Sequence, residues 1–183
     1  MKYNDIAILY RTNAQSRVFE EHLRRHNIPY RIYGGLSFYS RKEIKDVVAY
    51  LRLTVNYRDN EAFKRIINYP KRGLGNTTIA KITKYADDNQ VSMWEAIGMV
   101  PLSGRAKNTL LNFGMMIKDF QERAKTQDAY TIASYIVKKS GILDMLKVDN
   151  TPEGISRVEN VSSLLDGIKE FIDTDEIQEG QTL

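Results

Sequence analysis

The sequence predicts a mainly α-helical fold with a small βαβ unit at its N-terminus, followed by an all-α domain. Residues 6–10 form a continuous apolar run of the kind found in buried parallel strands. Residues 30–33 form a second strand-like segment, and the stretch between the two carries Val18, Phe19 and Leu23 at helical spacing. A strand, a helix and a strand within about 30 residues make one βαβ unit. Because two strands alone do not make a stable sheet, the unit predicts an incomplete α/β domain.

After residue 35 the apolar residues recur at helical spacing, which predicts helices throughout. The clearest case is a long amphipathic helix with Leu110, Phe113, Ile117 and Phe120 on one face. Residues that cap helix N-termini stand before several apolar stretches. These start signals are Ser40-x-x-Glu43, Ser92-x-x-Glu95, Asp128 and Thr151-Pro152.

A break in composition between Pro101 and Gly104 predicts a domain boundary. We expect residues 1–103 to belong to the domain that contains the βαβ unit. Residues 104–183 are expected to form the second, wholly helical domain.

Charge is unevenly distributed along the 183 residues, although the net charge is only +4. Residues 1–80 carry 15 Lys and Arg against 7 Asp and Glu, whereas residues 81–183 carry 12 against 16. This asymmetry indicates that the first half meets an anion such as nucleic acid or a nucleotide. An ordinary solvated surface is the alternative interpretation.

Several classes of function are excluded by what the sequence lacks. It contains no Cys, which excludes disulfide scaffolds, thiolate metal sites and cysteine nucleophiles. It contains no GxxxxGK[ST] phosphate-binding loop, so it has no complete nucleotide-hydrolysing site of that kind. Its longest apolar run, residues 47–51, is far shorter than the roughly 20 residues that span a bilayer. We therefore expect a cytoplasmic protein with no membrane partner.

The first candidate site follows the first predicted strand, where Tyr10 and Arg11 stand. Ligands bind at the carboxyl ends of parallel strands. An aromatic ring and a guanidinium at this place are suited to a base and a phosphate. The alternative is that Tyr10 packs against the sheet while Arg11 is a surface charge.

The second candidate site is the glycine-containing turn at residues 71–78. Glycines on both sides of Leu74 let the backbone approach a ligand, and the following helix offers N–H groups to a phosphate. A tight helix connection is the alternative interpretation. The turn at residues 138–141 is a fainter version of the same pattern, and there a plain helix stop is equally compatible. The candidate nucleic-acid contacts are Lys71, Arg72, Gly73, Gly75, Asn76, Thr77, Thr78, Lys138, Lys139, Ser140 and Gly141.

Residues 8–17 read Ile8-Leu9-Tyr10-Arg11-Thr12-Asn13-Ala14-Gln15-Ser16-Arg17. This segment resembles motif IV of the UvrD/PcrA/Rep group of superfamily 1 DNA helicases. Further similar segments are residues 28–35, 41–46, 49–53 and 65–75. The resemblance extends from residue 4 to about residue 172 and is looser in the second half.

The resemblance implies a role for each candidate. Residues 1–103 would be the first part of the second RecA-like domain (2A), and residues 104–183 part of the inserted helical domain (2B). Tyr10 would stack near the adenine of ATP, and Arg11 would act as an arginine finger on its γ-phosphate. Residues 72–78 would lie on single-stranded DNA, and residues 138–141 would touch duplex DNA.

The resemblance also implies that the chain is a fragment of an ATP-dependent 3′-to-5′ DNA helicase of bacterial repair or replication. The phosphate loop and the magnesium ligands would precede residue 1, so we expect no ATP hydrolysis by this chain alone. The implied partners are single-stranded DNA, single/double-strand junctions and repair proteins, in a nucleoid-associated cytoplasmic setting. Two other functions stay open: a non-specific nucleic-acid-binding module, and a helical protein-interaction module.

Overall fold

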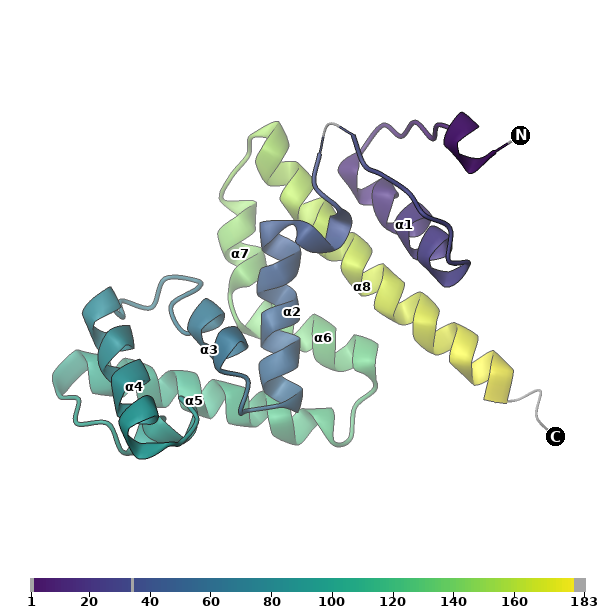
Figure 1. Ribbon diagram of the computed structural model, residues 1–183. Coiled ribbons are helices and arrows are strands. Elements are labelled where there is room, and N and C mark those ends of the chain that lie inside the picture. Colours follow the sequence, from purple (N-terminus) through teal and green to yellow (C-terminus); the bar gives the residue numbers. More distant parts are fainter. Residues whose placement is uncertain (1, 34, 180–183) are drawn as a thin grey trace. The chain divides into compact units, whose positions relative to one another are not determined.

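The computed structural model describes residues 2–33 and 35–179, and all its regular elements are helices (Figure 1). The α-helices are α1 (Ser16–Arg25), α2 (Lys42–Val55), α3 (Asn60–Ile66), α4 (Asn76–Asn89), α5 (Gly104–Ala124), α6 (Ala129–Lys139), α7 (Ile142–Lys147) and α8 (Pro152–Glu179). Four short 3-10 helices are η1 (Tyr3–Asp5), η2 (Asn13–Gln15), η3 (Phe38–Ser40) and η4 (Glu95–Gly98). The chain divides into two compact units, residues 1–45 with 146–183 and residues 46–145.

The predicted βαβ unit was wrong, because residues 2–33 and 35–179 contain no strand. Helix α1 forms between the two expected strands, but the segments on either side are irregular (Figure 1). Most of their apolar side chains are exposed, with Leu9 at 95% and Tyr33 at 84% of full exposure, whereas Tyr30 and Ile32 are half-buried. A strand is stable only when its backbone groups pair with a neighbour and one of its faces is buried. The sequence pattern of a strand was present, but these segments have neither form of support within the described residues.

The unit of residues 46–145 has an aromatic core contributed by several of its helices. Phe63 of α3 and Phe113 of α5 meet edge to face, with ring centroids 5.6 Å apart. Phe120 of α5 contacts Tyr50 of α2 at 6.5 Å and Tyr135 of α6 at 5.9 Å in the same manner. Edge-to-face pairs add about 0.5–1.5 kcal/mol beyond area burial. The predicted amphipathic helix is therefore confirmed as α5, whose apolar face forms much of this core.

Polar contacts join α1 to α8 in the unit of residues 1–45 and 146–183. Arg17 of α1 is only 3% exposed, and its guanidinium donates hydrogen bonds to Ser163 at 3.1 Å and Glu170 at 3.1 Å on α8. The Cα of Gly167 lies directly beneath that guanidinium, where a Cβ would collide with Nη1 of Arg17. Glycine at residue 167 therefore makes room for the arginine against α8.

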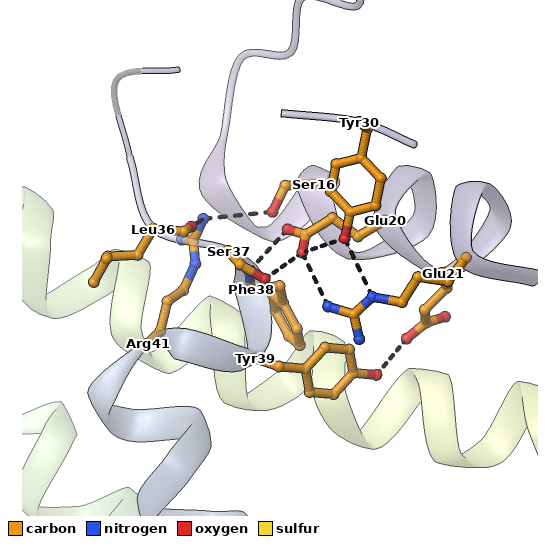
Figure 2. Close-up of polar contacts among 10 residues, drawn as sticks. Ser16, Glu20, Glu21, Tyr30, Leu36, Ser37, Phe38, Tyr39 and Arg41 are labelled. Atoms are coloured by element: carbon orange, nitrogen blue, oxygen red, sulfur yellow. Dashed lines mark hydrogen bonds and ion pairs between the residues drawn. The ribbon is translucent and has the colours of Figure 1, made fainter. Parts of the chain in front are cut away.

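A second polar cluster in this unit surrounds Glu20 of α1 (Figure 2). The carboxylate of Glu20 accepts hydrogen bonds from the backbone N–H of Phe38 at 2.8 Å and from the hydroxyl of Ser37. Beside it, the hydroxyl of Tyr39 donates to Glu21 at 2.7 Å, and burial together with this bond raises the pKa of Tyr39 to about 12. These bonds fix the segment after residue 35 against α1.

Most of the predicted helix start signals are confirmed by hydrogen bonds. Asp128 accepts from the N–H of Thr131 at 2.9 Å, and Thr151 accepts from the N–H of Gly154 at 3.1 Å. Ser92 and Glu95 bond each other's backbone N–H groups, as a capping box requires, although the helix they open is the 3-10 helix η4.

We predict opposite stability effects for two Gly→Ala changes inside helices. In Gly114→Ala, the new Cβ meets Ile97 at an ordinary 3.5 Å, so the helix gains about 0.5–1 kcal/mol from the lower backbone entropy of the unfolded chain. In Gly167→Ala, Arg17 must leave its partners, which costs about 1–3 kcal/mol. Urea unfolding of both variants checks this prediction, and a Gly167→Ala variant as stable as the wild type would contradict the role given to Arg17.

Candidate nucleic-acid interface

The glycine-containing turn predicted at residues 71–78 is held in place by Asn68, which precedes it, and by Leu74 within it. Oδ1 of Asn68 accepts hydrogen bonds from the backbone N–H groups of Arg72 at 2.9 Å and Leu74 at 3.2 Å. Leu74 is 1% exposed and anchors the turn in the core. Gly73 has φ +82°, a conformation that disfavours any residue with a side chain, whereas Gly75 at φ −75° does not require glycine. The turn is therefore rigid, with glycine needed at residue 73.

The guanidinium of Arg72 points into the unit of residues 46–145. It donates to the carbonyl of Ile66 at 2.8 Å at the end of α3, and to that of Ser140 at 3.4 Å at the end of α6. It also bonds the hydroxyl of Tyr50 and lies 5.3 Å from the ring centroid of Phe113. Carbonyls at helix C-termini lack intrahelical partners, and a positive charge there is favourable. A single arginine side chain therefore caps the C-termini of both α3 and α6.

Tyr50 completes the network around Arg72. Its hydroxyl donates to the carbonyl of Tyr69 at 2.7 Å while accepting from Arg72. Burial raises the pKa of Tyr50, and the charge of Arg72 opposes that shift without cancelling it. The hydroxyl proton therefore stays in place at neutral pH and holds the carbonyl of Tyr69.

The second predicted turn, residues 138–141, lies beside the first one. The bond between Arg72 and Ser140 joins the two turns. A Cβ placed on Gly141 would also be only 3.9 Å from Cγ of Pro70. Gly141 also has a positive φ, +82°, and Ser140 is buried at the C-terminus of α6. The structure thus brings together two of the sequence-predicted segments, although 60 or more residues separate them.

The exposure of the predicted contacts divides them into two groups. Arg72 and Ser140 are turned inward, as described above, and Gly141 is half-buried. The other group is exposed to solvent and lies on the same two turns and in the first turn of α4. This outward group consists of Lys71, Gly73, Gly75, Asn76, Thr77, Lys138 and Lys139, with Thr78 half-buried.

The N-terminus of α4 begins directly at the glycine turn. Gly75 is its N-cap residue and provides no side-chain hydrogen bond, and no acidic residue occurs in the first helical turn. The backbone N–H of Thr78 bonds the carbonyl of Gly75 at 3.0 Å, so the helix tightens at its start. This end of α4 therefore presents a partial positive charge next to Lys71.

Two residues of this region were missed by the sequence reasoning. Asn68 organises the turn, and the tendency of Asn side chains to bond nearby backbone N–H groups in turns is a signal that could have identified it. Arg105 in the first turn of α5 has its Nη2 4.0 Å from the Cβ position of Gly73. No pattern in the sequence predicts that Arg105 lies next to Gly73, because only the folded structure brings them together.

Tyr10 and Arg11 lie in the other unit, before η2. The ring of Tyr10 stacks on Phe19 of α1, with centroids 6.4 Å apart and planes 23° from parallel. The backbone N–H of Arg11 bonds Oε1 of Gln15 at 2.9 Å, and its side chain is exposed. The structure thus packs the aromatic ring on a helix and leaves the guanidinium accessible. Their nucleotide-binding role stays a prediction.

Among residues 2–33 and 35–179, no group of three or more His, Asp or Glu side chains is arranged to hold a metal ion. Within the same residues, no helix is both long and apolar enough to cross a membrane.

Comparison with known proteins identifies the class. The family of UvrD-like helicase C-terminal domains matches residues 1–183. ATP-dependent DNA helicase PcrA of Staphylococcus aureus is 40% identical over 181 residues, and DNA helicase II of Haemophilus influenzae is 40% identical over 182 residues. Each comparison covers 97% of this chain and 25% of the relative, so the chain spans about a quarter of the relatives' length. The chain belongs to the UvrD-like helicase C-terminal domain family.

We predict that Arg72→Met lowers the free energy of unfolding by about 2–4 kcal/mol, because carbonyls of two helix ends and the Tyr50 hydroxyl lose their donor. Arg72→Lys should recover part of this loss, since it keeps the charge but not the planar fork. Denaturant unfolding monitored by circular dichroism measures both.

Arg123→Met serves as the matched control for this prediction. Arg123 also lies over an aromatic ring, that of Tyr135 at 4.2 Å, but it pairs with Asp119 at the surface. Its replacement should lower the free energy of unfolding far less than Arg72→Met does, because exposed ion pairs contribute little. Equal losses in Arg72→Met and Arg123→Met would contradict the role assigned to Arg72.

Proposed function

We propose that this chain supplies a DNA-binding surface to an ATP-dependent 3′-to-5′ DNA helicase. The observation that carries the proposal is the adjacency of the two glycine-containing turns, both of which carry exposed lysines: Lys71 on one, and Lys138 and Lys139 on the other. Lysine side chains and backbone N–H groups contact phosphates without reading sequence, which suits a motor that must move along any DNA. The names of the relatives, ATP-dependent DNA helicase and DNA helicase II, support the same function.

Within this proposal the chain contributes only part of an ATP site. Arg11 reaches the γ-phosphate across a cleft, where a guanidinium stabilises charge that develops during phosphoryl transfer, and Tyr10 lies near the adenine. The phosphate loop and the ligands of Mg²⁺ come from other parts of the longer protein, since this sequence has no GxxxxGK[ST] loop. DNA unwinding then depends on coupling between that ATP site and the basic turns.

The proposal also assigns domains, partners and location. Residues 1–103 belong to the second RecA-like domain and residues 104–183 to the inserted helical domain. The partners are single-stranded DNA, single/double-strand junctions and proteins of DNA repair. Because the relatives named above come from bacteria, the setting is the bacterial cytoplasm, in association with the nucleoid.

We predict that the isolated chain hydrolyses no ATP, with or without DNA, because it has no phosphate-binding loop. A phosphate-release assay at saturating ATP and Mg²⁺ measures this. In the full-length protein, Arg11→Ala should lower kcat by about 10³-fold or more, as removal of an arginine finger does. Turnover by the isolated chain that disappears with Arg11→Ala would contradict this division of the ATP site.

We further predict salt-dependent binding of DNA by the chain. In fluorescence anisotropy with single-stranded, duplex and forked oligonucleotides, the logarithm of affinity should fall linearly with the logarithm of salt concentration. Lys71→Gln and Lys138→Gln should each reduce the slope by about 0.7–0.9, the value for one lost phosphate contact. Lys118→Gln on α5 is the control of equal charge and should leave the slope nearly unchanged. Indistinguishable slopes for Lys71→Gln and Lys118→Gln would refute the surface.

A further inference from the structure

Arg105 covers the backbone of the glycine turn from the side of α5. Its Nη2 is 4.0 Å from the Cβ position of Gly73, so the guanidinium lies directly next to the residue whose missing side chain leaves the backbone accessible. The side chain is exposed, and within residues 2–33 and 35–179 it forms no hydrogen bond or ion pair. Its five N–H donors are therefore available on the surface that the two turns form.

The position of Arg105 along α5 is electrostatically unfavourable for the isolated protein. It stands in the first helical turn, directly after Gly104, where the partial charge of the helix end is positive. The first turn contains no acidic residue, and the N-cap residue Ser103 makes no side-chain hydrogen bond. Lys107 adds another exposed positive charge close by in sequence. No anionic group of this helix end offsets these charges.

The segments that meet around Arg105 share one further property, an absence of acidic residues. Residues 62–86 contain six Lys and Arg, residues 96–118 contain three and residues 129–143 contain two, and none of these segments contains Asp or Glu. They include the glycine turn, the start of α5 and the turn after α6. Contacts of Gly73 with Arg105 and of Arg72 with Ser140 bring these three places together. Their shared charge attracts a polyanion.

We propose that Arg105 binds a DNA backbone phosphate next to the glycine turn, together with Lys71. A guanidinium holds a phosphate through two parallel N–H bonds, which a lysine cannot do. Because residue 73 has no side chain, the phosphate approaches both the turn backbone and the guanidinium. This inference rests on the proposed DNA-binding function and adds a third segment, from α5, to its two turns.

The test compares Arg105→Gln, Arg105→Lys and the wild-type 183-residue chain by fluorescence anisotropy over a salt series with duplex and single-stranded oligonucleotides. Arg58→Gln is the matched control, because the charge of Arg58 is already balanced by Glu95 at 3.5 Å. Arg105→Gln should weaken binding roughly 3- to 10-fold and reduce the salt slope by about 0.7–0.9. Arg105→Lys should keep the wild-type salt slope and bind with an affinity between those of the wild type and Arg105→Gln. Arg58→Gln should match the wild type in both.

Thermal unfolding of the same variants separates a DNA contact from a purely structural role. Arg105→Gln should unfold at the wild-type temperature, since no hydrogen bond within the described residues depends on this side chain. An unchanged salt slope, or weaker binding that follows a lowered Tm with the slope intact, would overturn the role of Arg105 alone. Failure of the wild-type chain to bind either oligonucleotide at low salt would overturn both this inference and the proposed function.

Discussion

The guanidinium of Arg72 lies among the carbonyl groups that end α3 and α6, and it donates hydrogen bonds to both helix ends. Both ends carry partial negative charge, so one half-buried cation satisfies acceptors of two helices that otherwise need water. Tyr50 and Phe113 enclose the guanidinium with aromatic surface. This one side chain therefore links the turn after α3 to the turn after α6.

The consequence of this contact is a surface assembled from distant parts of the sequence. Arg72 itself points inward and bonds Ser140 of the other turn, while Lys71 next to it and Lys138 and Lys139 before Ser140 are exposed. The positive φ values of Gly73 and Gly141 allow both turns to be tight enough for this approach. In the proposed function, the inward-pointing Arg72 therefore positions the two turns, and the exposed lysines together with Arg105 form the basic surface that binds DNA.

The helices and the family were predictable from sequence, whereas the strands and the pairing of the turns were not. Asp128 and Thr151 cap helices as predicted, because a cap is a local interaction of a side chain with the next few N–H groups. The apolar run at residues 6–10 has the pattern of a strand, but a strand also needs a partner that a local pattern does not supply. Arg72 was expected to face DNA because it stands beside Lys71, and sequence alone does not tell an arginine that closes helix ends from one on the surface. The place of Arg105 beside Gly73 comes entirely from tertiary packing.

The most direct test of the account is whether Arg72 keeps the two turns together. Because the chain has no Cys, nitroxide labels can be attached uniquely to Lys71→Cys and Lys139→Cys. In the otherwise wild-type chain, the two labels should broaden each other's electron paramagnetic resonance spectrum through dipolar coupling. With Arg72→Met added, the broadening should decrease at a temperature where circular dichroism shows the helices to be intact. A doubly labelled spectrum equal to the sum of the two single-label spectra, or broadening unchanged by Arg72→Met, would contradict the account.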